Sequence, residues 1–151
     1  MRALVVYDTV HGNTEQVARA IGDGLGEGWE VRVLKAAAAG PEDVLAADLV
    51  IVGTPTHAWN MTGGGRAFCR RLRGERYTDK LAAAFDTKIE GRFTGSAARK
   101  LARALGRLGF RLAASPESFY VRGMEGPLRE GELERARSFG ESLATAARPG
   151  G

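Results

Sequence analysis

A short polar loop near the start of the chain has residue types that suit an anion. Its residues are Thr9, Val10, His11, Gly12, Asn13 and Thr14. The loop follows the apolar run Ala3–Tyr7, which predicts a strand, and leads into a helical pattern over Thr14–Leu25. Backbone N–H groups and short hydroxyl side chains at the amino end of a helix bind phosphate. Since the loop has no Lys or Arg, this composition favours a phosphate monoester over a nucleoside triphosphate.

The same residues also suit an ordinary turn from a strand into a helix. In that interpretation Asn13 or Thr14 is the N-cap of the helix, and Gln16 completes a capping box with Asn13. The loop alone does not decide between the two interpretations, so the rest of the chain has to.

The rest of the chain predicts strands and helices in alternation. Strands are expected at 3–7, 29–34, 49–52 and 80–86, and in a fifth strand split between 110–113 and 118–121. Helices are expected at 14–25, 41–46, 63–72, 96–108 and 133–147. This order predicts a parallel sheet with helices on both faces, and a ligand at the carboxyl ends of the first and third strands. We expect a single domain over residues 1–148 and a disordered C-terminal tail at 149–151.

A long polar loop follows the third predicted strand, from Thr54 to Gly63. Its candidate binding residues are Thr54, Pro55, Thr56, His57, Ala58, Trp59 and Asn60. A flat ring in a ligand needs a flat apolar partner, which Trp59 or His57 would supply. The alternatives are that Trp59 packs on its own loop and that His57 is solvated.

A third loop follows the fourth predicted strand, from Thr87 to Gly95. Its candidate binding residues are Asp86, Thr87, Phe93 and Gly95, of which Phe93 is the only aromatic residue. An ordinary loop capped by Ser96 remains the alternative.

These three loops resemble the binding site of the flavodoxin family. The stretch Val5–Leu25 resembles the family's phosphate-binding pattern Thr/Ser-x-Thr-Gly-x-Thr, with His11 at the third position. The second loop is also similar to the Pro-Thr-x-x-x-Asn-Met loop of quinone reductases that depend on flavin mononucleotide (FMN). The matching residues there are Pro55, Thr56, Asn60 and Met61. The resemblance implies a three-layer α/β flavodoxin-like fold, with a five-stranded parallel sheet in the order 2-1-3-4-5, and FMN as the cofactor.

The resemblance further implies that the chain is an FMN-binding electron-transfer protein. One alternative is an enzyme, an FMN-dependent NAD(P)H quinone reductase, which the second loop favours. The other is a binding or regulatory module with this fold that has lost flavin. The second loop has no glycine between Gly53 and Gly63, and the third loop carries the basic residues Lys88 and Arg92, which keep that alternative open. The sequence leaves open whether the chain is an enzyme.

Composition limits the other functional classes. The chain has 151 residues, of which 44% are hydrophobic and 26% charged, as is usual for a soluble globular domain. The single Cys69 predicts a small buried hydrophobe and a cytoplasmic location. Two His and one Cys are too few for a metal cluster. The apolar runs are too short for a membrane span.

The net charge of +4 suits nucleic acid, a membrane surface or an acidic protein partner. We expect an acidic redox partner protein at Lys88 and Arg92, beside the predicted flavin edge. Nucleic acid is not expected, because no aromatic residues interleave with the basic cluster at a spacing that suits base stacking. That cluster is interpreted as a solvated helix face, and its residues are Arg70, Arg71, Arg73 and Arg76. A monomer or a weak homodimer is expected.

Overall fold

The structure, a computed structural model, describes residues 1–57, 60–91 and 95–148. The strands are β1 (Arg2–Tyr7), β2 (Glu30–Lys35), β3 (Leu49–His57), β4 (Asn60–Met61), β5 (Leu81–Ile89), β6 (Arg111–Leu112) and β7 (Glu117–Val121). The α-helices are α1 (Asn13–Leu25), α2 (Pro41–Leu45), α3 (Gly63–Arg71), α4 (Ala97–Arg107) and α5 (Glu132–Ala146), and a short 3-10 helix spans Ala36–Ala38. The predicted tail at 149–151 lies outside the described residues.

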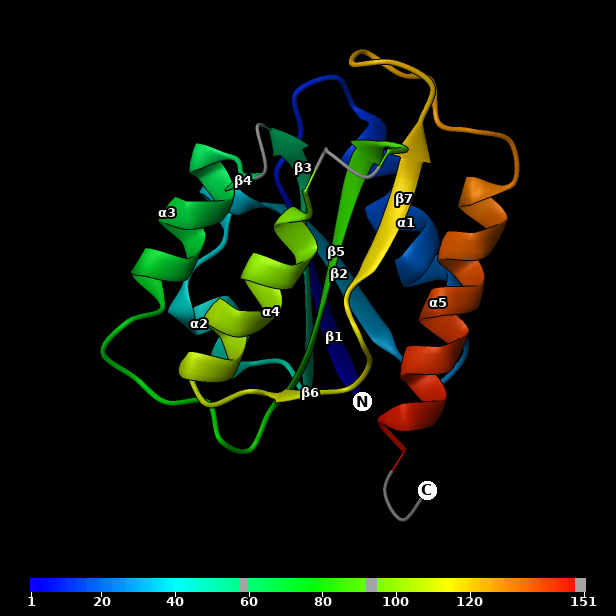
Figure 1. The fold of residues 1–151 in the computed structure, drawn as a ribbon. Coiled ribbons are helices and arrows are strands. Elements are labelled where there is room, and N and C mark those ends of the chain that lie inside the picture. Colours follow the sequence, from blue (N-terminus) through cyan, green and yellow to red (C-terminus); the bar gives the residue numbers. More distant parts are fainter. Residues whose placement is uncertain (58–59, 92–94, 149–151) are drawn as a thin grey trace.

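One sheet forms the middle of the molecule (Figure 1). Its strands lie in the order β2-β1-β3-β5, and both β6 and β7 pair with β5. All of these pairs are parallel, and only β4 runs antiparallel, beside the end of β3. The predicted order 2-1-3-4-5 is therefore confirmed, with β5 as the fourth strand. The fifth strand is split as predicted, since β6 pairs with the first half of β5 and β7 with the second.

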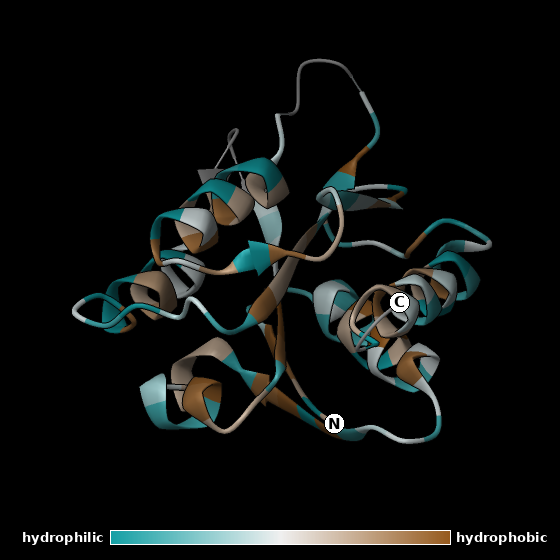
Figure 2. Ribbon diagram, turned by 90° about the horizontal axis from the view of Figure 1, so that it is seen from below, coloured by the Kyte–Doolittle hydropathy of each residue, from teal (hydrophilic) through white to brown (hydrophobic). Residues whose placement is uncertain are grey.

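Helices cover both faces of the sheet, because strand residues point alternately to either side. Ala3, Val5 and Tyr7 of β1 pack in the core beneath α1 and α5. Leu4 and Val6 pack in the second core, beneath α2, α3 and α4. Figure 2 shows the hydrophobic strands between the two groups of helices. The three-layer arrangement is therefore confirmed.

Helices α1 and α5 lie side by side, with their backbones in direct contact (Figure 1). A Cβ atom on Gly140 would lie 2.2 Å from the carbonyl oxygen of Ile21. A Cβ atom on Gly24 would lie 2.1 Å from the carbonyl oxygen of Arg137. Only glycine fits at this crossing, because any side chain would force the helices apart.

Two strands are longer than predicted, which changes the second and third loops. The sequence predicts that the third strand ends at Val52 and the fourth at Asp86, but β3 continues to His57 and β5 to Ile89. Both predictions are wrong for a tertiary reason. The β3–β5 pairing continues to Pro55 opposite Thr87, and β4 supports the end of β3 from its other side. The first residues of the predicted second loop are therefore strand residues.

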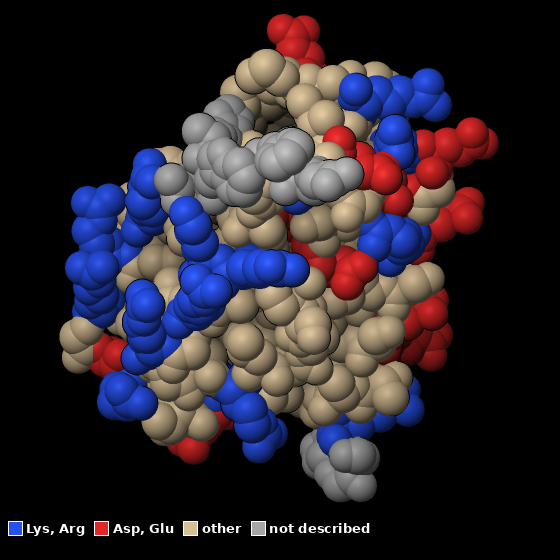
Figure 3. Space-filling model, viewed as in Figure 1, with Lys and Arg blue, Asp and Glu red and all other residues tan. Residues whose placement is uncertain are grey.

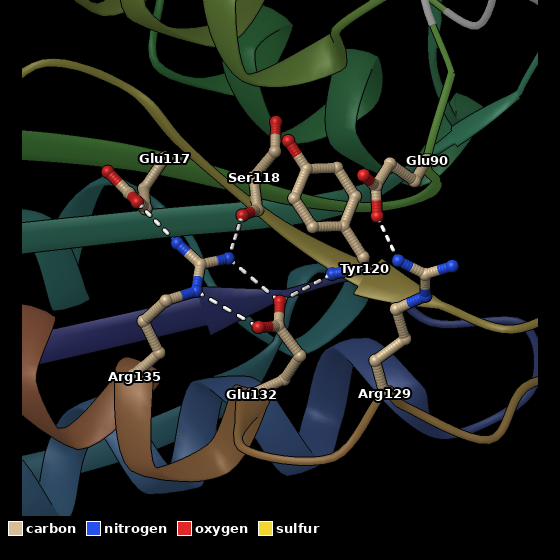
Figure 4. A network of polar contacts seen from close by, with 7 residues as sticks. All are labelled: Glu90, Glu117, Ser118, Tyr120, Arg129, Glu132 and Arg135. Atoms are coloured by element: carbon tan, nitrogen blue, oxygen red, sulfur yellow. Dashed lines mark hydrogen bonds and ion pairs between the residues drawn. The ribbon is translucent and has the colours of Figure 1, made fainter.

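Side chains of α5 and its preceding loop cover the outer edge of β7 (Figure 4). Glu132 accepts a hydrogen bond of 2.7 Å from the Tyr120 N–H. Arg135 donates to the Ser118 carbonyl and to the Glu132 carboxylate, and its guanidinium lies 4.6 Å from the centroid of the Phe119 ring. These contacts occupy backbone groups that another strand would otherwise pair with.

None of the helices in the described part of the chain is long and apolar enough to cross a membrane.

Candidate functional site

The carboxyl edge of the sheet brings the three predicted loops together. The Thr14 and Thr87 hydroxyl oxygens are 2.8 Å apart, which joins the first loop to β5. The Thr56 hydroxyl donates a hydrogen bond of 2.9 Å to Asp86, which joins β3 to β5. The candidate site therefore lies between the ends of β1, β3 and β5, which is the edge of the sheet at which ligands of such folds bind.

The first loop ends at Gly12, which is the N-cap residue of α1 and has a φ of +87°. The prediction that Asn13 or Thr14 caps the helix is wrong, because both residues already lie in its first turn. No side chain caps this helix, so the N–H groups before Gln16 are left for a ligand or water. The Gly12 N–H donates a hydrogen bond of 2.9 Å to the Thr9 hydroxyl, which holds the loop in its bend.

The side chains of Asn13 and Thr14 hold the first loop in place from within. Thr14 has no exposed surface, and its hydroxyl pairs with that of Thr87. Asn13 is 8% exposed, and its amide donates a hydrogen bond of 3.2 Å to the Glu125 carbonyl. The two side chains that would otherwise cap the helix are thus hydrogen-bonded to residues far away in the sequence.

The sequence did not predict the segment that reaches Asn13, which is the loop 122–131 between β7 and α5. Val121 and Leu128 form an antiparallel bridge, so the segment turns back on itself. The Gly126 backbone then lies directly against the Asn13 amide. In the sequence, the glycines and proline between Gly123 and Pro127 indicate a turn. They do not indicate which other loop this turn contacts.

Asp86 holds the amino end of α4. It has no exposed surface, and its Oδ2 atom accepts hydrogen bonds from the Thr56 hydroxyl, the Ser96 hydroxyl and the Ala98 N–H, at 2.9, 2.9 and 3.0 Å. Its other oxygen, Oδ1, has no partner among the described residues. Ser96 stands at the N-cap position of α4 but makes no capping bond itself. Asp86 and Thr56 cap this helix instead, since the Ala97 N–H donates to the Thr56 hydroxyl.

Asp8 also shapes the site, and it was not among the residues predicted from the sequence. Its carboxylate accepts a hydrogen bond from the Thr62 hydroxyl, just before α3. The Gly64 backbone lies so close that a Cβ atom there would be 2.5 Å from the Asp8 carboxylate. A carboxylate is favourable at the positive end of a helix, so Asp8 fixes the start of α3 beside the first loop.

The remaining predicted residues differ in their exposure. Val10 and His11 are exposed, whereas Thr54 is fully buried and donates a hydrogen bond of 3.0 Å to the Pro55 carbonyl. The Lys88 amine donates a hydrogen bond to the Gly95 carbonyl. The structure gives His57 and Asn60 as a backbone pair between β3 and β4. Outside the described residues lie Ala58, Trp59, Arg92 and Phe93.

Two side chains, those of Tyr7 and Cys69, have raised pKa values. Burial raises the pKa of Tyr7 at the end of β1, and the Glu15 carboxylate raises it further, so the phenol stays neutral. Burial also raises the pKa of the Cys69 thiol, against the opposing charge of Arg73. Cys69 packs against the core and therefore behaves as the small hydrophobe that the sequence predicts.

The described part of the site fits a phosphate group. The Thr9 hydroxyl accepts a bond from Gly12 and keeps its own hydrogen, which points to no protein acceptor in the described residues. With the uncapped N–H groups of α1, this hydroxyl is a donor of the kind that a dianionic phosphate needs. The Thr14 and Thr87 hydroxyls are buried against each other and fix the loop behind these donors.

Comparison with known proteins decides the family. The sequence profile of the flavodoxin family matches residues 5–139. The chain belongs to the flavodoxin family. A flavodoxin from Aquifex aeolicus is 35% identical over 91 residues, which cover 57% of this chain and 49% of that protein. A coenzyme F420H(2) oxidase from Methanothermobacter marburgensis is 31% identical over 156 residues, covering 97% of this chain and 36% of the oxidase.

Solved structures show the same fold. A short-chain flavodoxin associated with a bacterial microcompartment has a TM-score of 0.83 at 22% identity, covering 98% of this chain and 99% of that one. Flavodoxin 2 from Bacillus cereus has a TM-score of 0.84 at 22% identity, covering 96% and 99%. The chain thus spans nearly all of these flavodoxins, but about half of the Aquifex protein and about a third of the oxidase.

Proposed function

We propose that the chain binds FMN and transfers electrons. The observation that carries the proposal is the uncapped amino end of α1, which follows a left-handed Gly12 at the carboxyl end of β1. This arrangement suits a terminal phosphate, and family membership supports FMN as its source. When bound, FMN supplies the chemistry of accepting and donating electrons.

The residues have separate roles in this proposal. The N–H groups of the first turn of α1 and the Thr9 hydroxyl hold the phosphate. Thr14 and Thr87 fix the loop against β5, so that those donors stay in position. The ends of β3 and β5 lead into the loops that would hold the flavin ring, and Trp59 and Phe93 belong to those loops in the sequence.

Titration of the apoprotein with three flavins tests the proposal. We expect FMN to bind more tightly than riboflavin, since riboflavin leaves the phosphate donors unused, and more tightly than FAD, which is larger at that end. Thr9→Ala and Thr14→Ala should each weaken FMN by about 1–2 kcal/mol, because each removes a hydroxyl from this network. Thr78→Ala, at an exposed position in another loop, is the matched control. Equal affinity for riboflavin and FMN would contradict the proposal, and failure of every flavin to bind would favour a module that has lost flavin.

The second candidate is an FMN-dependent NAD(P)H quinone reductase. The observation in its favour is the hairpin of β3 and β4, which pairs Thr56 with Met61 within the segment that resembles the loop of those enzymes. Anaerobic mixing of the FMN-loaded protein with NADH or NADPH distinguishes the two. In a carrier, the flavin absorbance should bleach slowly. In an enzyme, it should bleach within the turnover time, and a quinone should then reoxidise the flavin.

A carrier needs a partner protein. We expect that partner to be acidic because the chain has a net charge of +4. A cytoplasmic location and a monomer or weak homodimer complete the proposal.

A further inference from the structure

Half of the basic residues of the chain lie in two segments on one side of the sheet. Residues 63–80 and 97–111, which comprise α3, α4 and the segments after them, contain eleven Lys and Arg and two acidic residues, a net charge of +9. All other residues contain eleven basic and sixteen acidic residues, a net charge of −5. Figure 3 shows the basic side chains over α3 and α4 and most of the acidic ones elsewhere. The net charge of +4 therefore conceals a strong separation of charge.

Most of the arginines on this basic face make no ion pair or side-chain hydrogen bond with the part of the chain that the structure describes. Eight are exposed and form no ion pair or side-chain hydrogen bond with any described residue: Arg66, Arg70, Arg73, Arg76, Arg99, Arg103, Arg107 and Arg111. Elsewhere Arg19, Arg32 and Arg135 are each paired with a carboxylate. Like charges held together repel one another, so a face of this kind is stabilised when an acidic surface covers it.

The basic face is continuous with the candidate flavin site. Helix α3 begins after Thr62, which is bonded to Asp8 at the end of β1. Helix α4 begins at Ala97, whose N–H is bonded to Thr56 at the end of β3. Arg66 and Arg99 lie in the first turns of these helices. A partner that covers α3 and α4 therefore also reaches the carboxyl edge of the sheet.

We propose that the face formed by α3 and α4 is the docking surface for an acidic redox protein. The inference rests on the proposed function, because electron transfer requires the two cofactors to approach closely. It also places the docking charge differently from the sequence prediction. Lys88 keeps its charge but is half-buried and bonded to the Gly95 carbonyl, and Arg92 lies outside the described residues. The exposed arginines of α3 and α4 therefore carry this placement.

A protein fits this face better than a single-stranded nucleic acid does. The aromatic residues of these segments are Phe68, Tyr77 and Phe110, and they are 0%, 2% and 5% exposed. None of them is available to stack on a base, which is how single-stranded nucleic acids are commonly held. Charge without stacking suits the acidic side chains of a protein.

Two charge-reversal variants with the same net charge test the proposal. The first, Arg70→Glu with Arg103→Glu, changes one exposed residue on each helix of the face. The control, Arg137→Glu with Arg148→Glu, changes two exposed residues on and after α5. Each variant has a formal net charge of zero, so only the position of the charge differs. The probe is a fluorescently labelled acidic [2Fe–2S] ferredoxin, whose binding to the apoprotein is followed by anisotropy, from about 0.01 M to about 0.2 M salt.

We expect wild type to bind the ferredoxin more weakly as salt rises. The variant on the basic face should bind about tenfold more weakly at low salt and lose most of the salt dependence, while the control stays close to wild type. Equal weakening of both variants would show that only net charge matters and would overturn the proposal. So would binding that does not depend on salt, or no binding by wild type.

A 20-base-pair duplex DNA serves as the competing probe. Tighter binding of the duplex than of the ferredoxin, abolished by the variant on the basic face, would overturn the proposal in favour of nucleic acid. Circular dichroism of both variants checks that they fold. FMN titration of the same samples is read separately: docking without FMN binding refutes the proposed function alone, and FMN binding without docking refutes this inference alone.

Discussion

Replacing Glu132 by Gln is expected to destabilise the fold by about 2 kcal/mol. The carboxylate accepts hydrogen bonds from the Tyr120 N–H at 2.7 Å and from two nitrogens of Arg135 at 3.0 and 2.7 Å (Figure 4). Arg135 also bonds Glu117 and the Ser118 carbonyl. A glutamine has the same shape, but it has no charge and turns an NH₂ group toward these donors.

The size of the effect follows from the burial of the partners. The Glu132 side chain is 11% exposed and that of Arg135 is 37% exposed. Breaking a buried pair by removing one partner costs about 3–5 kcal/mol. Water takes over part of the solvation of Arg135, so the lower value of about 2 kcal/mol applies. For a domain of this size that corresponds to a fall in Tm of roughly 4–8 °C.

The stabilisation should depend on pH in a defined direction. Burial alone would raise the pKa of Glu132, but the hydrogen bonds and charge of Arg135 and the Tyr120 N–H outweigh it and hold the pKa below its ordinary value of 4.5. A carboxyl group with a lowered pKa in the folded state binds protons less readily than in the unfolded state. Its contribution is therefore complete above pH 4.5 and is lost as the pH falls below it.

Urea unfolding of wild type, Glu132→Gln and Glu134→Gln provides the assay. Glu134 is an exposed acidic residue in the same first turn of α5, so it controls for the loss of charge near the helix amino end. We expect the Glu132→Gln difference to be steady from pH 6 to 8 and to shrink toward pH 4. The reasoning is refuted if both variants lose the same stability, or if the difference is unchanged at the lowest pH at which wild type still folds.

Three further predictions concern the site and the core. Bound FMN should quench tryptophan fluorescence, and Trp59→Ala should remove this quenching. Trp29→Phe should keep it, because Trp29 lies at the amino end of β2, away from the site. The opposite result would show that the flavin does not lie against the second loop. Gly140→Ala should cost about 2–3 kcal/mol in urea unfolding, since its Cβ atom would meet the backbone of α1, whereas Gly106→Ala, with open space around it, should stabilise α4 by about 0.5–1 kcal/mol. Thr87→Val should lower stability by about 1–2 kcal/mol by leaving a buried hydroxyl unpaired, and an unchanged unfolding midpoint would contradict that account.

Local patterns in the sequence were enough to predict the order of the elements. An uninterrupted apolar run such as Leu49–Val52 suits only a strand buried on both faces, and the helical spacing of Leu101 and Leu105 suits one face of a helix. Because strands and helices alternate, the parallel sheet and the edge that carries the site follow from general rules of topology. These features depend on residues close together in the chain. The structure confirms the order of the elements and the parallel sheet, and the position of the site remains a prediction.

The contacts within the site depend on residues far apart in the chain, so only the tertiary structure decides them. Asn13 and Thr14 are good capping residues by type, but Glu125 and Thr87 bind their side chains, and the cap falls to Gly12. Asp86 caps α4 from a neighbouring strand, and β3 extends to His57 because β4 and β5 are there to pair with it. Propensity is a property of a segment alone, whereas a hydrogen bond needs both of its partners in place. The sequence by itself therefore determined which loops follow the ends of the central strands, and the tertiary structure determined which donors in those loops are already bonded within the protein.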